Sequence, residues 1–166
     1  MGVKITDPKQ RRKITRGLEE MKRKRGQLIT WALEIEELLE GILSRYFRRG
    51  ATGEEIAFFE AGILRDLHFE KKIQIFEKVI KKEKYDPQKI KTIMTAIREV
   101  QNMRNKGGHW RHLVFLDSGK IVFRKKHELN PQDLLNIDKK RLKKVEQSKE
   151  TAFQGIVKFH QWFHSK

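Results

Sequence analysis

The chain has 166 residues, no cysteine, and 38 Lys and Arg against 22 Asp and Glu, which give a formal net charge of +16. This length fits one domain over residues 1–166, and the absence of cysteine excludes disulfides and thiolate zinc sites while permitting a reducing cytoplasm. Residues 1–25 are too charged for a signal peptide, and no apolar run approaches the roughly 20 residues that span a bilayer, so we expect a cytoplasmic protein without membrane contact.

Residues 8–49 are predicted to be helical, in two pieces that meet near Gly26. The first piece belongs to a basic N-terminal helical extension, residues 1–27. The second carries one continuous apolar stripe, which indicates packing in a bundle. The stripe consists of Leu28, Trp31, Ala32, Ile35, Leu38, Leu39, Ile42, Leu43, Tyr46 and Phe47.

A short second helix is predicted after this one. Gly50 follows the cations of the preceding helix, a pattern typical of a helix C-terminus. Thr52 or Gly53 then begins a new helix, which we expect Phe58 and Phe59 to anchor.

Two further helices are predicted before residue 109. Residues 68–83 repeat the helical pattern, and Asp86-Pro87 supplies a cap and a first-turn proline for the next helix. The next position on the apolar stripe of that helix is Arg104, which indicates a packed or interface location because an unpaired buried charge is costly. The stripe before it consists of Ile90, Ile93, Ile97 and Val100.

The sequence pattern changes from helical to strand-like after this helix. Two apolar runs, residues 113–116 and 120–123, flank Asp117-Ser118-Gly119, which predicts a β-hairpin over residues 112–126. A last helical region begins near Asn130. The fold class that follows is all-α: an antiparallel bundle of four or five helices with a short β-hairpin inserted before the last helix.

Positive charge is concentrated in residues 9–25, 104–126 and 139–149, with an acidic patch in residues 34–40 between them. Nucleic acid is the first candidate partner, because phosphate backbones reward clustered Lys and Arg with counterion release. A membrane surface ranks second and is not the expected partner, because an interfacial helix would also need a strong apolar face beside its basic one; a merely solubilising charged surface is the alternative to both.

The segment from Arg104 to His109 has the chemistry of a phosphodiester site. Arg offers a permanent fork of donors for phosphate, and His exchanges a proton near neutral pH. Gly107-Gly108 is expected to turn the backbone so that His109 folds back toward Arg104. One His per chain leaves either the acid or the base role vacant, and a symmetric dimer would fill it. The alternative is an ordinary basic helix end that leads into a strand.

Residues 100–109 resemble the signature of the HEPN superfamily, in which Arg, a polar residue and a short spacer precede His at the end of a helix. Residues 37–47 and 67–73 resemble the earlier helices of that family, so the likeness covers about residues 28–163. The resemblance implies a helical homodimer and a metal-independent endoribonuclease of the toxin, abortive-infection or RNA-processing type. It also implies that Arg104, Asn105 and His109 are catalytic, are paired across a two-fold axis, and leave a cyclic phosphate and a 5′-OH.

Three neighbouring residues are candidates for RNA binding: Lys106, Trp110 and Arg111. Antitoxin-regulated family members carry a Tyr two residues after the His, where this chain has Arg111. An antitoxin or another regulatory protein is nevertheless a candidate partner alongside RNA. Gly107-Gly108 also departs from the more usual Leu-Ala type of pair.

Other features favour structural readings. His160 and His164, four apart, and His109 with His112 have spacings that suit a metal, but no third ligand is evident and the neighbourhood of His109 is basic. We therefore expect no metal and no cofactor. The alternative function is a non-catalytic HEPN-like module that binds nucleic acid or an acidic partner.

Two more candidate sites are better explained by structural roles. Trp31 could stack on a base, but its stripe position favours the core. Glu34, Glu37 and Glu40 could form a carboxylate site, but a solvated face or salt bridges to the basic helices are the favoured reading.

Overall fold

The structure is a computed structural model that describes residues 7–109, 111–115, 120–124 and 137–165, with side chains for residues 7–108 and 137–165. The described part is predominantly helical, which confirms the all-α class. In chain order the elements are α1 (Pro8–Phe47), α2 (Gly53–Phe59), the π-helical turn η1 (Glu60–Leu64), α3 (Phe69–Lys82), α4 (Pro87–His109), β1 (Arg111–Phe115), β2 (Lys120–Arg124) and α5 (Lys139–His164).

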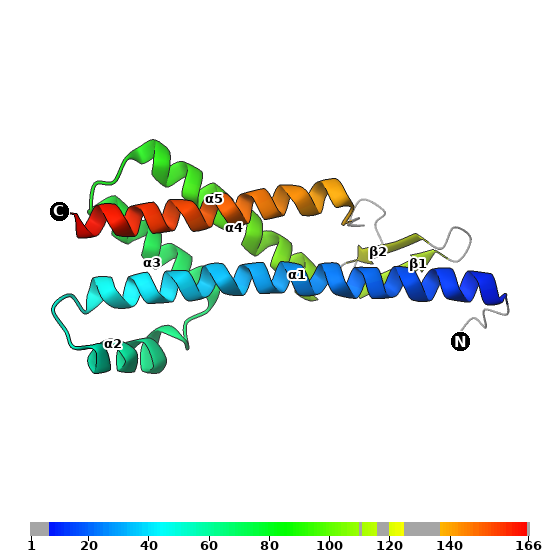
Figure 1. Ribbon diagram of the computed structural model, residues 1–166, viewed down its shortest axis with the longest axis horizontal. Coiled ribbons are helices and arrows are strands. Elements are labelled where there is room, and N and C mark those ends of the chain that lie inside the picture. The colour runs from blue at the N-terminus through cyan, green and yellow to red at the C-terminus, as the bar shows by residue number, and fades with distance from the viewer. Residues whose placement is uncertain (1–6, 110, 116–119, 125–136, 166) are drawn as a thin grey trace.

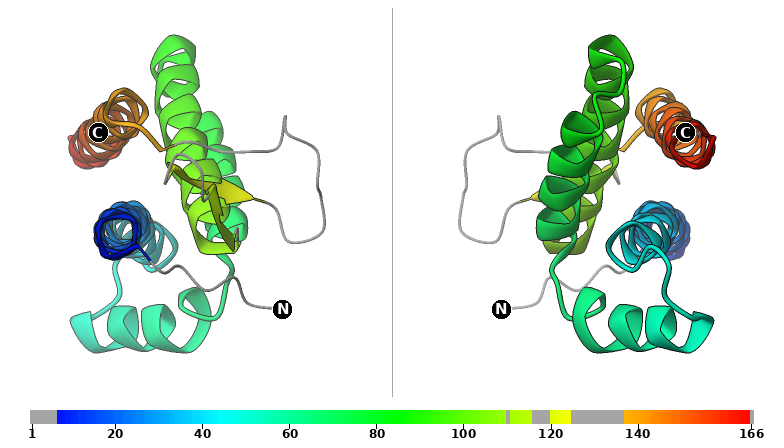
Figure 2. Two further views of the ribbon diagram at one scale, coloured as in Figure 1. Left: turned by 90° about the vertical axis from the view of Figure 1, so that its right-hand side faces the viewer. Right: turned by 90° about the vertical axis from the view of Figure 1, so that its left-hand side faces the viewer.

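The long helices α1 and α5 lie side by side, and α3 and α4 pack against them on one side (Figures 1 and 2). They run in the same direction, because Lys24 contacts Ile137 at one end and Arg45 contacts His160 at the other. Helix α4 runs the opposite way and passes close to α5 at Gly155, where a β-carbon would lie 2.4 Å from the Ile93 side chain.

The expectation of an antiparallel bundle is therefore wrong for part of the fold. Helices α1 and α3 are also parallel, since Lys72 pairs with Glu36 near the start of α3 and Tyr46 donates to Glu83 after its end. The cause is the α2–η1 segment, which carries the chain back along α1 before α3 begins (Figure 1). Among the four long helices that the structure describes, α1, α3, α4 and α5, only α4 runs against its neighbours (Figure 1).

One apolar core joins the four long helices. Helix α1 is continuous through Gly26, so the expected break into two pieces is wrong: a helical glycine costs only about 1 kcal/mol, and burial on both sides of it outweighs that cost. The fully buried apolar core includes Leu28, Ile35, Leu39, Leu43, Ile73, Phe76, Ile80, Ile97, Val100, Met103, Val145, Ile156 and Phe159.

Local capping chemistry sets several helix ends as predicted. Asp86 Oδ1 accepts hydrogen bonds from the backbone N–H groups of Gln88 (2.8 Å) and Lys89 (3.2 Å), which caps α4. Thr52 and Glu55 form a capping box at the start of α2. These bonds satisfy backbone donors that have no partner within the helix.

The anchoring expected of the two α2 phenylalanines holds for only one of them. Phe59 packs against the core, whereas Phe58 is 76% exposed. The pattern of two adjacent phenylalanines cannot place both on one face of a helix, because neighbours lie about 100° apart.

Strands β1 and β2 pair antiparallel, with Arg111 opposite Arg124 and Phe115 opposite Lys120. β2 contacts α1. The expected hairpin range, residues 112–126, falls partly outside the described residues, at positions 116–119 and 125–126. Of the helices that the structure describes, none combines the length and the apolar character needed to cross a bilayer.

Candidate nucleic-acid interface

The Arg104 motif, Arg104 to His109, occupies the last two turns of α4, where this helix packs against α1. Gly107 is buried, and a β-carbon there would lie 3.4 Å from Leu28 Cδ1. The Arg25 guanidinium of α1 donates a hydrogen bond of 2.7 Å to the carbonyl oxygen of Gly108. A cation at this position also opposes the negative end of the helix dipole. Contacts with Leu28 and Arg25 of α1 thus hold the backbone of the motif in place.

The glycine pair does not turn the chain. Helix α4 continues through Gly107 and Gly108 to His109, and neither glycine has a positive φ. The expectation that His109 folds back toward Arg104 is therefore wrong. The contact with Leu28 and the Arg25 hydrogen bond stabilise the helical form.

Arg104 and Asn105 lie together. Arg104 is half-buried at the end of the apolar stripe, as its phase predicted, and its Nη1 lies 3.3 Å from the exposed Asn105 Oδ1. Within the described part of the chain, Arg104 has no carboxylate at ion-pair distance, whereas the half-buried Arg48 and Lys149 are paired with Glu55 and Glu34. Among the described residues, no carboxylate therefore competes with an anionic ligand for the guanidinium of Arg104.

Helix geometry sets the register of the other motif residues. His109 lies four residues after Asn105 and so on the same face of α4, while Arg104 lies about 140° away around the helix. Lys106 is half-buried on the same turn. Arg111 is the first residue of β1, and Trp110 lies outside the described residues.

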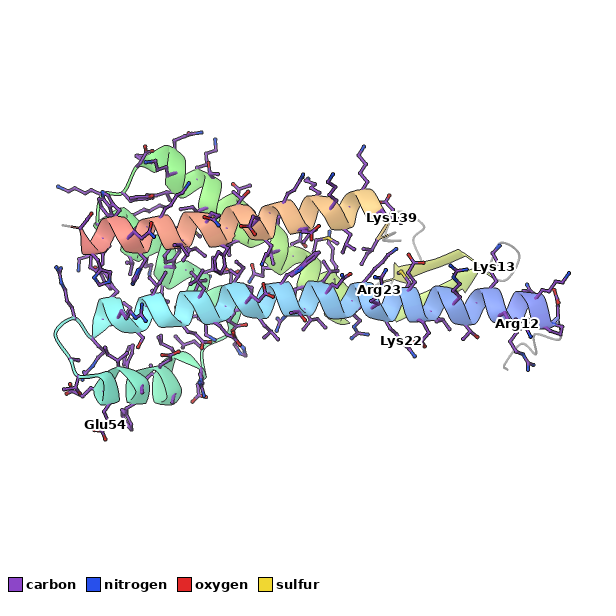
Figure 3. The ribbon with its side chains drawn as sticks, in the orientation of Figure 1. Arg12, Lys13, Lys22, Arg23, Glu54 and Lys139 are labelled. Carbon is purple, nitrogen blue, oxygen red and sulfur yellow. The ribbon has the colours of Figure 1, made fainter. Side chains whose placement is uncertain are left out.

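Two adjacent cations of α1 connect the motif to the start of α5. Arg25 reaches Gly108 at the end of α4, and Lys24 donates from Nζ to the carbonyl oxygen of Ile137 at 2.9 Å. Sequence reasoning assigned no individual role to Lys24 or Arg25, because such contacts between distant segments leave no periodic signal. They bring the three basic segments of the chain to one end of the molecule (Figure 3).

The histidines near the C-terminus form a different cluster. The rings of His160 and His164 lie 4.4 Å apart between centroids, and the Arg45 Nη1 is 3.4 Å from the His160 Nε2. Burial, with the nearby charges of His164 and Arg45, lowers the pKa of His160. No three potential metal-binding side chains come together among the residues whose positions are described.

The acidic patch provides salt bridges, which was its favoured reading. Glu34 pairs with Lys149 at 2.8 Å, and Glu40 pairs with Lys72 of α3. Trp31 is partly buried against the core. Two of the three candidate carboxylates, Glu34 and Glu40, are therefore paired with lysines of other helices, and Glu37 is exposed.

Comparison with protein-family models, with curated proteins and with solved structures finds no match to this chain.

Replacing both motif glycines with alanine is expected to raise stability by up to about 1 kcal/mol per position, because alanine favours a helix more than glycine does. Space permits it: a β-carbon at Gly108 meets nothing within 4 Å, and one at Gly107 makes an ordinary contact with Leu28. Urea unfolding of Gly107→Ala and Gly108→Ala measures the change. Gly26→Ala, another open helical position, is the control, and a loss of stability only at residues 107 and 108 would indicate that the pair needs a non-helical conformation.

Proposed function

We propose that this chain is a metal-independent endoribonuclease of the HEPN type that cleaves RNA at a composite site formed by two copies of the chain. The observation that carries the proposal is the half-buried Arg104, which lies beside Asn105 without a carboxylate partner among the described residues. Such a charge is costly unless a ligand or a partner surface compensates it. A phosphodiester is the ligand that a planar guanidinium fork suits best.

The proposed reaction needs a base, an acid and a stabiliser of negative charge. One imidazole removes the proton of the 2′-OH, and the resulting oxygen attacks the adjacent phosphorus. A second imidazole protonates the departing 5′-oxygen, so the products are a 2′,3′-cyclic phosphate and a 5′-OH. His109 of one copy supplies one role and His109 of the other copy supplies the second, while Arg104 holds the charge that develops on the phosphate. Asn105 orients Arg104 through its side-chain oxygen.

The residues around the motif are proposed to hold the RNA. Lys106 and Arg111 would contact phosphates, and Trp110 would stack on a base. The biological setting that the resemblance suggests is a cytoplasmic toxin, an antiviral defence nuclease or an RNA-processing enzyme. An antitoxin or another regulatory protein would then control it.

The test is cleavage of single-stranded and structured RNA by the purified chain in EDTA. We expect His109→Ala to lower the rate by about 10²- to 10⁴-fold, the range typical of acid–base groups, and Arg104→Ala by about 10²- to 10³-fold, the range typical of a donor that stabilises developing charge. Lys78→Gln, an exposed charge change on α3, is the control for nonspecific loss of charge. The products should carry the cyclic phosphate and the 5′-OH.

The second candidate is a non-catalytic nucleic-acid-binding module, and the net charge of +16 favours it independently of the motif. If the wild-type chain binds RNA tightly but cleaves none of several sequences, the result favours the non-catalytic binding module. Cleavage that requires a divalent metal would contradict the metal-independent mechanism but not the assignment as a nuclease.

A further inference from the structure

A row of arginines follows the solvent side of the first half of α1. Arg12, Arg16 and Arg23 fall within about 40° of one another around the helix. They lie opposite the buried residues Ile14 and Met21, and all three are exposed. We call these three residues the arginine stripe.

The arginine stripe is not neutralised by its own helix. The nearby acidic residues Glu19 and Glu20 pair instead with Lys22 and Lys24, at 2.7 and 2.8 Å. Lys24 in turn is held by the Ile137 carbonyl oxygen. Arg12, Arg16 and Arg23 form no ion pair with any residue that the structure describes.

The start of α5 extends the positive surface. The hydrogen bond and charge of Lys24 lower the pKa of Glu20, and the charges of Arg23 and Lys139 lower it further. Lys139 therefore lies near the Arg23 end of the arginine stripe (Figure 3). Figure 3 shows Arg23 on α1 and Lys139 on the adjoining end of α5. Lys143 is also exposed and lies one turn further along the same face of α5. Lys139, Lys143 and the arginine stripe together form the arm surface.

The arginine stripe faces away from the Arg104 motif. Arg25, which reaches the end of α4, lies about 160° around α1 from Arg23. Figure 2 shows α4 on one side of the pair formed by α1 and α5. The arginine stripe is therefore separate from the motif, so a ligand that occupies both must be extended.

The composition of the arm surface selects the kind of nucleic acid. Residues 8–27 and 137–152 contain no Phe, Tyr or Trp. Proteins that hold single strands use aromatic side chains as stacking platforms, whereas duplex RNA is bound through shape, 2′-OH and phosphate contacts. Twenty helical residues make a straight rod about 30 Å long, which is long enough to follow a duplex backbone.

We propose that the arm surface binds the sugar–phosphate backbone of double-helical RNA, so that the substrate carries a stem outside the cleavage site. The choice of RNA over other polyanions rests on the proposed function. The surface itself does not depend on the cleavage chemistry.

The test is fluorescence anisotropy with a duplex RNA of about 16 base pairs, the length that a double-stranded RNA-binding domain spans. The variant Arg12→Gln/Arg16→Gln/Arg23→Gln should bind on the order of 100-fold more weakly near physiological salt, and its slope of log affinity against log salt should fall by about 2 to 3. The matched control, Lys71→Gln/Lys78→Gln/Lys82→Gln, removes the same charge from exposed positions of α3 and should lose much less. Circular dichroism and thermal melting confirm that both variants fold.

Equal losses in the two triple variants would overturn the arm surface in favour of diffuse charge. Tighter binding of the single strand than of the duplex would overturn the choice of ligand, and equal affinity for duplex DNA would overturn its assignment to RNA. The variant Arg104→Ala/His109→Ala should keep duplex affinity while losing cleavage. A wild-type chain that binds duplex RNA through the stripe yet never cleaves would refute the proposed function and leave this inference standing.

Discussion

Replacing Lys72 with methionine should lower the free energy of unfolding by roughly 3–5 kcal/mol, the cost of breaking a buried ion pair by removing one partner. Lys72 is 2% exposed, and its Nζ lies 2.6 Å from Glu36 Oε1 and also contacts Glu40. Burial by itself lowers the pKa of Lys72, but the hydrogen bonds that its ammonium donates to Glu36 and Glu40, with the charges of these carboxylates, outweigh burial and raise the pKa. Without the lysine, two carboxylates lie close together with no compensating charge.

Urea unfolding measures this loss as a shift of the midpoint at constant slope. Lys71→Met on the exposed side of α3 is the matched control and should change stability by less than about 0.5 kcal/mol. Adding Glu36→Gln and Glu40→Leu to Lys72→Met should recover most of the loss, because the buried charges then disappear together. A loss below about 1 kcal/mol in Lys72→Met would mean that water reaches the carboxylates.

The residues of this ion-pair cluster illustrate what a sequence does not reveal. Lys72 is 36 residues from Glu36 and 32 from Glu40, and charged residues on an amphipathic helix read as a solvated face. The parallel arrangement of α1 and α3, which brings them together, depends on the return path through α2 and η1. Nothing in the local periodicity encodes that path.

Features that depend on neighbouring residues could be predicted. The cap at Asp86 and the capping box at Thr52 follow from side chains that reach their own backbone, and both are present. The half-buried position of Arg104 follows from helical phase alone.

Both errors about helix continuity concern glycine. At Gly26 and at Gly107-Gly108 the sequence favours a break or a turn, yet the helix continues because contacts from other elements exceed the small propensity cost of glycine. Gly50, in contrast, has φ +85° and lies in the turn that follows α1, where the sequence predicts the end of a helix. The turn at Gly50 is predictable from neighbouring residues alone. The conformation at Gly107 and Gly108 depends on Leu28 and Arg25, which are distant in the sequence.

The continuity of α4 bears on the two-chain site that we propose. In a straight helix Arg104 and His109 differ by about 140° in direction, so the glycine turn first expected does not fold His109 back toward Arg104 of the same chain. A second copy related by a two-fold axis can place its own motif opposite the first. The composite site then requires two intact chains.

Mixing wild type with a fivefold excess of Arg104→Ala/His109→Ala is therefore expected to reduce the activity per wild-type chain to about one sixth, because random exchange leaves one wild-type chain in six with a wild-type partner. The mixed dimer lacks one His109 and one Arg104, and loss of one acid–base group costs about 10²- to 10⁴-fold. Cleavage is measured at saturating RNA, so that binding of substrate by the inactive chains has no effect. The same excess of bovine serum albumin is the control for protein concentration.

Two other outcomes have distinct structural meanings. Activity that stays constant after exchange, with mixed dimers demonstrated by native mass spectrometry, would place a complete site within one chain. Conversely, mixing Arg104→Ala chains with His109→Ala chains restores activity only if each site takes its arginine from one chain and its histidine from the other. A single site that uses both histidines predicts that this second mixture stays inactive, because every mixed dimer then lacks one acid–base group. The same site predicts the fall to about one sixth in the first mixture.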